Sequence, residues 1–176
     1  MKQIFRLTFT LLAICATVAA ALAGVNALTG PVIAQRNEEK LQAAIEKVLP
    51  GGGTGLESFP DETGMIRAVY ASEKGYAMEV VTAGFGGSIT MMVGVADGQV
   101  TAIEIISHGE TPSLGAVAAA DNARGKSFRE QFAGLSGTLA VTRDGGQIDS
   151  ITSATITSRA VTAGVNAALA CAKALG

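Results

Sequence analysis

Hydrophobic and polar positions divide the chain into an unbroken apolar run, a middle part with strand-like patterning and a C-terminal part with helical spacing. From Leu7 to Gln35 there are 29 consecutive residues without a charge. The apolar part of this run, residues 7–28, is long enough to cross the roughly 30 Å hydrocarbon core of a bilayer as a helix. The pattern predicts a single transmembrane helix at the N-terminus.

The residues around this run are compatible with two alternatives, a retained membrane anchor and a cleaved signal peptide. Lys2 and Arg6 precede it, and Ala21-Leu22-Ala23 is similar to a signal-peptide cleavage site, so cleavage after Ala23 is the alternative to a retained anchor. The uncharged run continues past Ala23, beyond the about 7–15 apolar residues of a signal peptide's central region, which favours the anchor. With basic residues ahead of the span, we expect a cytoplasmic N-terminus and a domain on the outer (periplasmic or extracellular) face of a bacterial cell membrane.

A short helix and a glycine-rich break are expected next. Asn37 is a suitable N-cap and Pro50 a helix stop. One helical face between them is apolar, with Leu41, Ala44, Ile45, Val48 and Leu49. No Gly-Lys-Ser/Thr follows Gly51–Gly55, so that stretch predicts a linker rather than a phosphate loop. We expect an anchor (residues 1–35), a connecting helix and linker (36–60) and a larger domain (61–176).

The middle of the chain has the pattern of β-strands. Asp97-Gly98 is a strong hairpin signal, and Phe128, Phe132 and Leu135 have helical spacing that favours packing against a core. Strand-length runs rich in Val, Ile, Thr and Tyr occupy Met65–Ser72, Gly75–Thr82, Ser88–Val95 and Val100–Ser107, and Leu139–Thr142 predicts a further short strand. Because hairpins join several strands, we expect an α+β domain with a mixed, partly antiparallel sheet and flanking helices.

Candidate chemistry is concentrated between Asp149 and Ser158, where six of ten residues carry a hydroxyl. A helical pattern follows at once, with Val161, Val165, Leu169 and Ala172 on one face and Thr157 or Ser158 as a suitable N-cap. A helix N-terminus offers unpaired N–H groups and the positive end of the helix dipole, which suits a phosphate. The alternative is that these hydroxyls only cap the helix and close a turn.

Two motifs carry a family resemblance. His108-Gly109-Glu110-Thr111-Pro112-Ser113-Leu114-Gly115 is similar to His-x-Glu-Thr-Pro-Gly-Leu-Gly, and Asp149-x-x-Thr152-Ser153-Ala154-Thr155 is similar to the flavinylation motif Asp-x-x-Ser/Thr-Gly-Ala-Thr. Both motifs resemble those of the FMN-binding domain in the G subunit of Rnf-type electron-transport complexes and the C subunit of Na+-pumping NADH:quinone reductases. The resemblance covers roughly residues 75–174, and Gly84–Ile89 is a weaker match in which Phe85 is either core or flavin contact. Ser113 and Ser153 replace glycines of the family.

The resemblance implies a cofactor and a site. It implies FMN attached covalently through its phosphate to Thr155 by a separate Mg2+-dependent flavin transferase, which would recognise Asp149, Thr152 and Ala154. Noncovalent contacts to FMN are expected from Glu110, Thr111, Leu114, Gly115, Thr152, Ser153 and Ala154. No residue is expected to be catalytic by itself.

The resemblance also implies a role and partners. It implies a membrane-anchored subunit that relays electrons within an Rnf-type ion-translocating ferredoxin:NAD oxidoreductase, coupled to Na+ or H+. The partners would be the other membrane, iron–sulfur and flavin subunits, one of which binds NAD(H). The alternatives are a noncatalytic exported sensor or adhesion domain whose hydroxyl cluster is only structural, and a flavoprotein reductase working without a complex.

Charge and residue types narrow the remaining possibilities. Residues 36–176 carry 11 basic and 15 acidic residues, a net charge of −4, which argues against a nucleic-acid partner. His108 is the only histidine, so neither a metal site nor a nucleophilic triad is expected. The spacing of Cys15 and Cys171 suits neither an iron–sulfur cluster nor a disulfide framework.

Overall fold

The computed structural model describes residues 2–176, with side chains from Ile4 onward, and divides the chain into one unit up to residue 40 and another from residue 41 to 176. The first unit consists of most of α1 (Lys2–Val48), a continuous helix with Pro31 inside it. By length and composition α1 is able to cross a membrane, and its apolar side chains in this part are exposed. The predicted N-terminal apolar helix is confirmed.

The predicted start of a second helix at Asn37 is wrong, because α1 continues through this residue without a break. Asn is only moderately unfavourable inside a helix, by less than about 1 kcal/mol relative to Ala. Gln35 Nε2 also donates to Glu39 Oε1 across one turn, at 3.1 Å. The helix ends at Val48, close to the predicted stop at Pro50. The domain boundaries expected at residues 35 and 60 remain a prediction.

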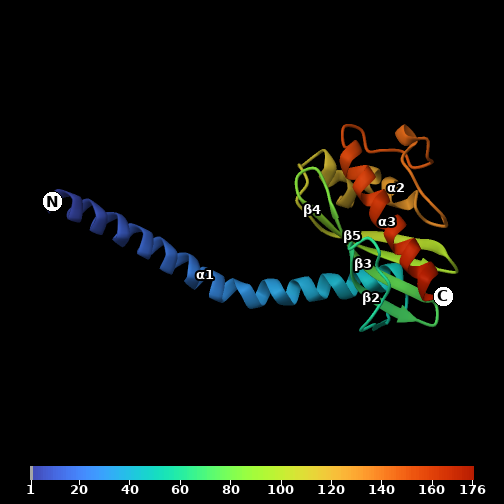
Figure 1. Cartoon of the computed structure of the whole chain (residues 1–176), viewed down its shortest axis with the longest axis horizontal. Coiled ribbons are helices and arrows are strands. Elements are labelled where there is room, and N and C mark those ends of the chain that lie inside the picture. The colour runs from blue at the N-terminus through green and yellow to red at the C-terminus, as the bar shows by residue number, and fades with distance from the viewer. Residues whose placement is uncertain (1) are drawn as a thin grey trace. The chain divides into compact units, whose positions relative to one another are not determined.

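The second unit contains a five-stranded sheet whose strands lie side by side in chain order (Figure 1). The strands are β1 (Thr54–Gly55), β2 (Ile66–Ser72), β3 (Gly75–Ala83), β4 (Ser88–Ala96) and β5 (Gln99–His108). Every pairing between them is antiparallel. The four predicted strands are confirmed to within one residue at each end. The predicted hairpin is confirmed as well, since Asp97 and Gly98 both have positive φ, 52° and 72°, as a two-residue turn of this kind requires.

Successive side chains of the sheet contribute to two different cores, as the two-residue period of a strand requires. Met91 and Val93 of β4 belong to the larger core, whereas Met92 between them belongs to a smaller one. The smaller core is completed by the last turns of α1, through Ile45 and Val48, which lie in the same unit as the sheet. The middle of the sheet, around β4, is therefore buried on both faces.

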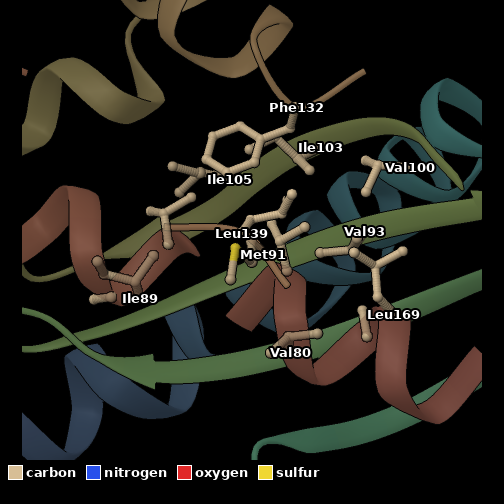
Figure 2. Close-up of a cluster of buried hydrophobic side chains, with 14 of the residues drawn as sticks. Val80, Ile89, Met91, Val93, Val100, Ile103, Ile105, Phe132, Leu139 and Leu169 are labelled. Atoms are coloured by element: carbon tan, nitrogen blue, oxygen red, sulfur yellow. The ribbon is translucent and has the colours of Figure 1, made fainter. Parts of the chain in front are cut away.

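Helix α3 (Thr155–Leu175) packs on the face with the larger core (Figure 1). Figure 2 shows Leu169 of this helix gathered with Val80 and Val93 of the sheet. The predicted apolar face is confirmed, since its four members are all buried. At Gly164 a Cβ would collide with the side chains of both Met91 and Thr82, so this glycine lets α3 approach the sheet closely without displacing them. This packing fixes the position of the helix whose first turn follows the hydroxyl-rich segment.

The segments between β5 and α3 depart most from prediction. They contain η1 (Gly115–Ala119), α2 (Ala123–Glu130) and η2 (Thr142–Asp144). Helix α2 begins and ends earlier than its apolar spacing suggests, and Phe132 lies beyond it, in edge-to-face contact with Phe128 at 5.6 Å between ring centroids.

The strand predicted at residues 139–142 is wrong. Only one isolated parallel bridge forms there, between Val141 and Ile148, because the chain turns back through η2 and Ala140 O accepts from both Gln147 N and Ile148 N. The α+β class is confirmed; the sheet itself is antiparallel throughout, and the parallel bridge lies outside it.

Candidate functional site

The hydroxyl-rich segment forms a tight loop closed by Ser158. The Ser158 hydroxyl accepts from Ile151 N–H and donates to Ala154 O, both at 3.0 Å, and the side chain is fully buried. Ala154 is the N-cap of α3 and provides no side-chain cap. The prediction that Thr157 or Ser158 caps the helix is therefore wrong. Both lie inside the first turns, because the Ser158 hydroxyl is used to close the loop in front of them.

Ser153 lies within this loop in a left-handed conformation, with φ of 65°. Ser113, in the other motif, has φ of 64°. Apart from Asp97 in the hairpin turn, these are the non-glycine residues with positive φ in the described part of the chain. A residue with a side chain costs roughly 1–2 kcal/mol in this region of conformational space. The two serines that replace glycines of the motifs are thus the two that adopt glycine-like conformations at the site.

Thr155 is the first residue of α3, and its side chain is only partly buried. Within residues 4–176, whose side chains are described, its hydroxyl has no hydrogen-bond partner, and Thr152 and Ser153 beside it are exposed. The first turn of α3 contains no acidic residue. The backbone N–H groups at such a helix start have no acceptors within the helix. The start of α3 therefore presents the free hydroxyl of Thr155 next to backbone amides that can bind an anion.

Thr157, two residues further on, has the opposite environment. It is 1% exposed, and its hydroxyl donates to Glu110 Oε2 at 2.5 Å. Glu110 is itself buried, at 7% exposure, and its other oxygen accepts from Gly86 N–H at 3.1 Å. This carboxylate is where the two motifs meet, although about 40 residues separate them in the chain.

The segment around Glu110 leaves the end of β5 and enters η1. Glu110 N–H donates to His108 Nδ1 at 3.3 Å. Thr111 and Leu114 are exposed, whereas Gly115 is buried against the Glu110 carboxylate and the Thr157 hydroxyl. The structure thus brings Glu110 and Gly115 close to the first turn of α3, and leaves the side chains of Thr111 and Leu114 exposed.

Three large apolar side chains of residues 41–176 are exposed, and all belong to this region. They are Phe85 at 71%, Leu114 at 43% and Ile156 at 50%. Each is adjacent in sequence to a residue that either hydrogen-bonds the Glu110 carboxylate or is a glycine at which an added Cβ would collide with it. The question left open for Phe85 is resolved in part, since it is not a core residue. Sequence reasoning missed Ile156, because a lone apolar residue in a polar loop has no periodic context.

A pocket of about 350 Å³ lies between α2 and the start of the second motif. Gln131 holds this start in place: its Oε1 accepts from Asp149 N–H at 2.7 Å, and its Nε2 donates to Asp149 O at 3.3 Å. Ser150 Oγ is buried here and has no partner among the described residues. Sequence reasoning also missed Gln131, since a single Gln has no pattern. A larger cavity, about 710 Å³, lies at the other end of α3 beside Lys173, and neither motif contributes to it.

Charges near the site are few. The Arg159 guanidinium hydrogen-bonds Asp144 at 2.5 and 2.7 Å, which lowers the pKa of that carboxyl and raises the pKa of Arg159.

Burial, followed by the charge of Asp61, raises the pKa of the Cys171 thiol. Across residues 4–176, no three His, Cys, Asp or Glu side chains gather where they could hold a metal ion.

An apolar helix followed by an α+β domain, with these two motifs joined at one buried carboxylate, defines a class of anchored cofactor-binding proteins. Residues 84–170 match the profile of the FMN-binding domain. The chain is 35% identical to the G subunit of the Na+-translocating ferredoxin:NAD+ oxidoreductase complex of Acetobacterium woodii, covering 94% of this chain and 89% of that protein. It is 35% identical to the counterpart from the proton-translocating complex of Clostridium ljungdahlii, covering 96% and 91%.

A third relative is the G subunit of the ion-translocating oxidoreductase complex of Cereibacter sphaeroides, 37% identical over 77% of this chain and 68% of that protein. This chain belongs to the FMN-binding domain family, in the branch formed by the G subunits of ion-translocating oxidoreductase complexes.

Proposed function

We propose that this protein is the subunit of an Rnf-type ion-translocating ferredoxin:NAD oxidoreductase that carries FMN bound covalently to Thr155 and relays electrons through it. The observation that carries the proposal is the free, partly exposed hydroxyl of Thr155 at the uncapped start of α3. The alignment with the G subunits of such complexes over nearly the whole chain supports the assignment.

The residues at the start of α3 fit a phosphate group. The helix has no side-chain cap and no acidic residue in its first turn, so its amides remain free for an anion. Thr152, Ser153 and Ala154 form the loop directly before these amides. We assign Thr152, Ser153 and Ala154 to the phosphate end of FMN.

The contrast between the two threonines favours attachment at Thr155 by an external enzyme. A hydroxyl is a weak nucleophile that needs a neighbouring base. Thr157 has such a base in Glu110, but it is buried, whereas Thr155 is accessible and has none. A flavin transferase would supply the base, and the co-reactant would be an activated flavin nucleotide whose FMN phosphate is part of a phosphoanhydride. Thr155 Oγ would form the new bond to phosphorus, the anhydride P–O bond would break and release the rest of the nucleotide as its phosphate monoester, and the hydroxyl proton would pass to the transferase.

Thr111, Leu114, Gly115 and Glu110 are assigned to the flavin side of the site. Leu114, Phe85 and Ile156 each expose apolar surface, and each is next in sequence to a residue that lies against the Glu110 carboxylate. A planar, largely apolar ring suits a surface of this kind. When bound, the flavin supplies the electron-transfer chemistry, while the protein provides binding, orientation and electrostatics.

The apolar part of α1 is assigned to the membrane, with the N-terminus in the cytoplasm and the FMN-binding domain on the outer face. Lys2 and Arg6 ahead of the span support this orientation. Covalent attachment would retain the flavin on a face of the membrane from which a free cofactor diffuses away. Protease added to intact spheroplasts should digest the domain. A domain that stays protected would show that the orientation is inverted.

The attachment is tested by coexpressing the full chain with a flavin transferase and viewing a denaturing gel under ultraviolet light. The wild-type band should fluoresce and Thr155→Ala should be dark. Thr157→Ser is the matched control, because it keeps the hydroxyl that Glu110 binds, and it should fluoresce. A dark wild-type band, or a Thr155→Ala band that still fluoresces, would contradict attachment at Thr155. Copurification of other membrane subunits with the yellow protein tests membership of a complex.

A further inference from the structure

We propose that Glu110 is a positioning residue whose buried carboxylate joins the first turn of α3, the loop Gly84–Gly87 and Gly115, and so sets the orientation of Thr155 for flavin attachment. This inference rests on the proposed function, because it gives Glu110 its role in that same site. Glu110 acts through its protein neighbours in this account, in addition to any contact with the flavin.

Each carboxylate oxygen of Glu110 accepts a hydrogen bond from a different segment of the chain. Oε2 accepts from the Thr157 hydroxyl at 2.5 Å, which ties the carboxylate to the first turn of α3. Oε1 accepts from Gly86 N–H at 3.1 Å, which ties it to the loop between β3 and β4. Both glutamate and threonine are more than nine-tenths buried. Hydrogen bonds to an ionised group in such surroundings are stronger than those between neutral groups.

The glycines around Glu110 show how closely the segments approach the carboxylate. At Gly84 a Cβ would collide with Oε1, and at Gly115 it would collide with Oε2 and with the Thr157 hydroxyl. At Gly86 a Cβ would collide with the carbonyl oxygen of Gly109 in the same way. Four short segments therefore meet here without space for side chains. A shift of any one of them would displace the others, because packed interiors contain few voids.

The charge of Glu110 has no cationic partner. Among the described residues, none of the ion pairs involves Glu110, and the nearby ring nitrogen of His108 accepts from its backbone rather than binding its carboxylate. The carboxylate is held by its two hydrogen bonds, one of them to the first turn of α3, the end of the helix at which the dipole favours a negative charge. Removing either bond leaves a buried polar atom unsatisfied, which is costly. The segments are therefore linked through Glu110 itself.

Two pairs of variants and one control distinguish the hydrogen bonds of Glu110 from its negative charge and from the general stability of the protein. Glu110→Ala removes both hydrogen bonds, whereas Glu110→Gln keeps them, with its oxygen toward Gly86 N–H and its amide group toward the Thr157 oxygen. Thr157→Val keeps the shape of the threonine and loses its hydroxyl, whereas Thr157→Ser keeps the hydroxyl. Val69→Ala, in the buried part of β2, is a destabilised control remote from the motifs. If Glu110→Ala does not fold, the Thr157 pair makes the same test.

The first measurement is the rate at which a flavin transferase labels Thr155 in the full-length protein, followed by in-gel fluorescence. Glu110→Ala and Thr157→Val should slow labelling by about ten- to a hundredfold, because small misplacements of a reacting group have effects of this size. Thr157→Ser and Val69→Ala should stay close to the wild-type rate, and Glu110→Gln should be labelled faster than Glu110→Ala because it keeps both hydrogen bonds. The second measurement, hydrogen exchange of the unlabelled protein, should show faster exchange at Ser158 N–H, which donates to Ala154 O, in the two slow variants only, and faster exchange at Gly86 N–H in Glu110→Ala.

Labelling of both Glu110→Ala and Thr157→Val at the wild-type rate would overturn the proposal. If Val69→Ala is labelled as slowly as Glu110→Ala, the slower labelling results from a general loss of stability. If Glu110→Gln is labelled as slowly as Glu110→Ala, it results from the lost negative charge and not from the lost hydrogen bonds. Each of these results also counts against Glu110 as a positioning residue. If wild type itself is never labelled, the proposed covalent attachment fails, and hydrogen exchange alone then decides the role of Glu110.

Discussion

Two loops in this protein begin with aspartate, contain a residue in the left-handed conformation and end where a regular element starts. The first loop, Asp61–Ile66, leads into β2, and the second loop, Asp149–Thr155, leads into α3. In the first loop the left-handed residue is Gly64, with φ of 67°, and in the second it is Ser153, with φ of 65°. Their polar groups are nevertheless used in different ways.

In the first loop the aspartate satisfies the loop's own donors. Asp61 Oδ1 accepts from the N–H and hydroxyl of Thr63 and from Gly64 N–H, at 2.7–3.0 Å, and Oδ2 accepts from Ile66 N–H at 2.9 Å. In the second loop Asp149 is held by its backbone through Gln131, and the hydroxyl of Thr155 forms no hydrogen bond within the described residues. The first loop is arranged for stability, and the second leaves groups free at a cost in strain, as functional sites do.

The sharpest test of this comparison exchanges the two aspartates for alanine. Asp61→Ala should lower the free energy of unfolding by about 1–3 kcal/mol, because it leaves several donors without their charged acceptor. Asp149→Ala should change it by less than about 0.5 kcal/mol, the usual range for exposed positions, yet reduce flavin labelling of Thr155. Denaturant unfolding and in-gel fluorescence measure the two effects. Equal losses of stability would remove the distinction between the loops.

Exchanging the left-handed residues comes next in size. Ser153→Gly should stabilise the protein by about 1 kcal/mol, and Gly64→Ser should destabilise it by a similar amount, because only glycine adopts positive φ without a steric penalty. Ser153→Gly should also raise flavin occupancy. Ser113→Gly is the matched control at the other strained serine and should give a similar gain in stability. Unchanged or lower flavin occupancy in Ser153→Gly would indicate that the serine hydroxyl contributes to phosphate binding.

The acid sensitivity of the first loop should be measurable. Desolvation alone would raise the pKa of Asp61, but hydrogen bonds from the Thr63 hydroxyl and from the N–H groups of Ile66, Thr63 and Gly64 outweigh it, and the pKa of Asp61 is lowered. A lowered folded-state pKa contributes stability above the ordinary pKa of aspartate, which is lost as pH falls through the folded-state value. Melting temperature should therefore fall less between neutral and acidic pH in Asp61→Asn than in wild type. Parallel pH profiles would contradict this.

The smallest effect is expected at the ion pair beside the second loop. Asp144 and Arg159 form two hydrogen bonds, but both side chains are solvent-exposed, so the attraction is largely screened. Asp144→Asn should leave the denaturation midpoint unchanged within error in physiological salt, and labelling of Thr155 should remain as in wild type. A clear loss of labelling would show that the second loop depends on this pair for its position.

Much of the fold follows from the sequence because local periodicity determines it. The strands from Ile66 to His108 and the turn at Asp97-Gly98 were predicted almost to the residue, since alternating side chains and a turn that requires positive φ are local properties. The failures occurred at Asn37, at the predicted strand 139–142 and in the extent of α2, where propensity is weak and neighbouring segments decide.

The functional site likewise has one part that the sequence predicts and another that only the tertiary structure shows. Sequence alone identifies the residues that carry the motifs and predicts a helix after Thr155, because a hydroxyl-rich segment ahead of an apolar helical face is a local pattern. Tertiary packing was needed to show that Ala154, rather than Thr157 or Ser158, caps that helix, that Gln131 holds Asp149, and that Glu110 joins Thr157 to Gly86. Such contacts depend on segments about 20 to 50 residues apart being packed together, and no local pattern encodes which partner a buried polar group will find.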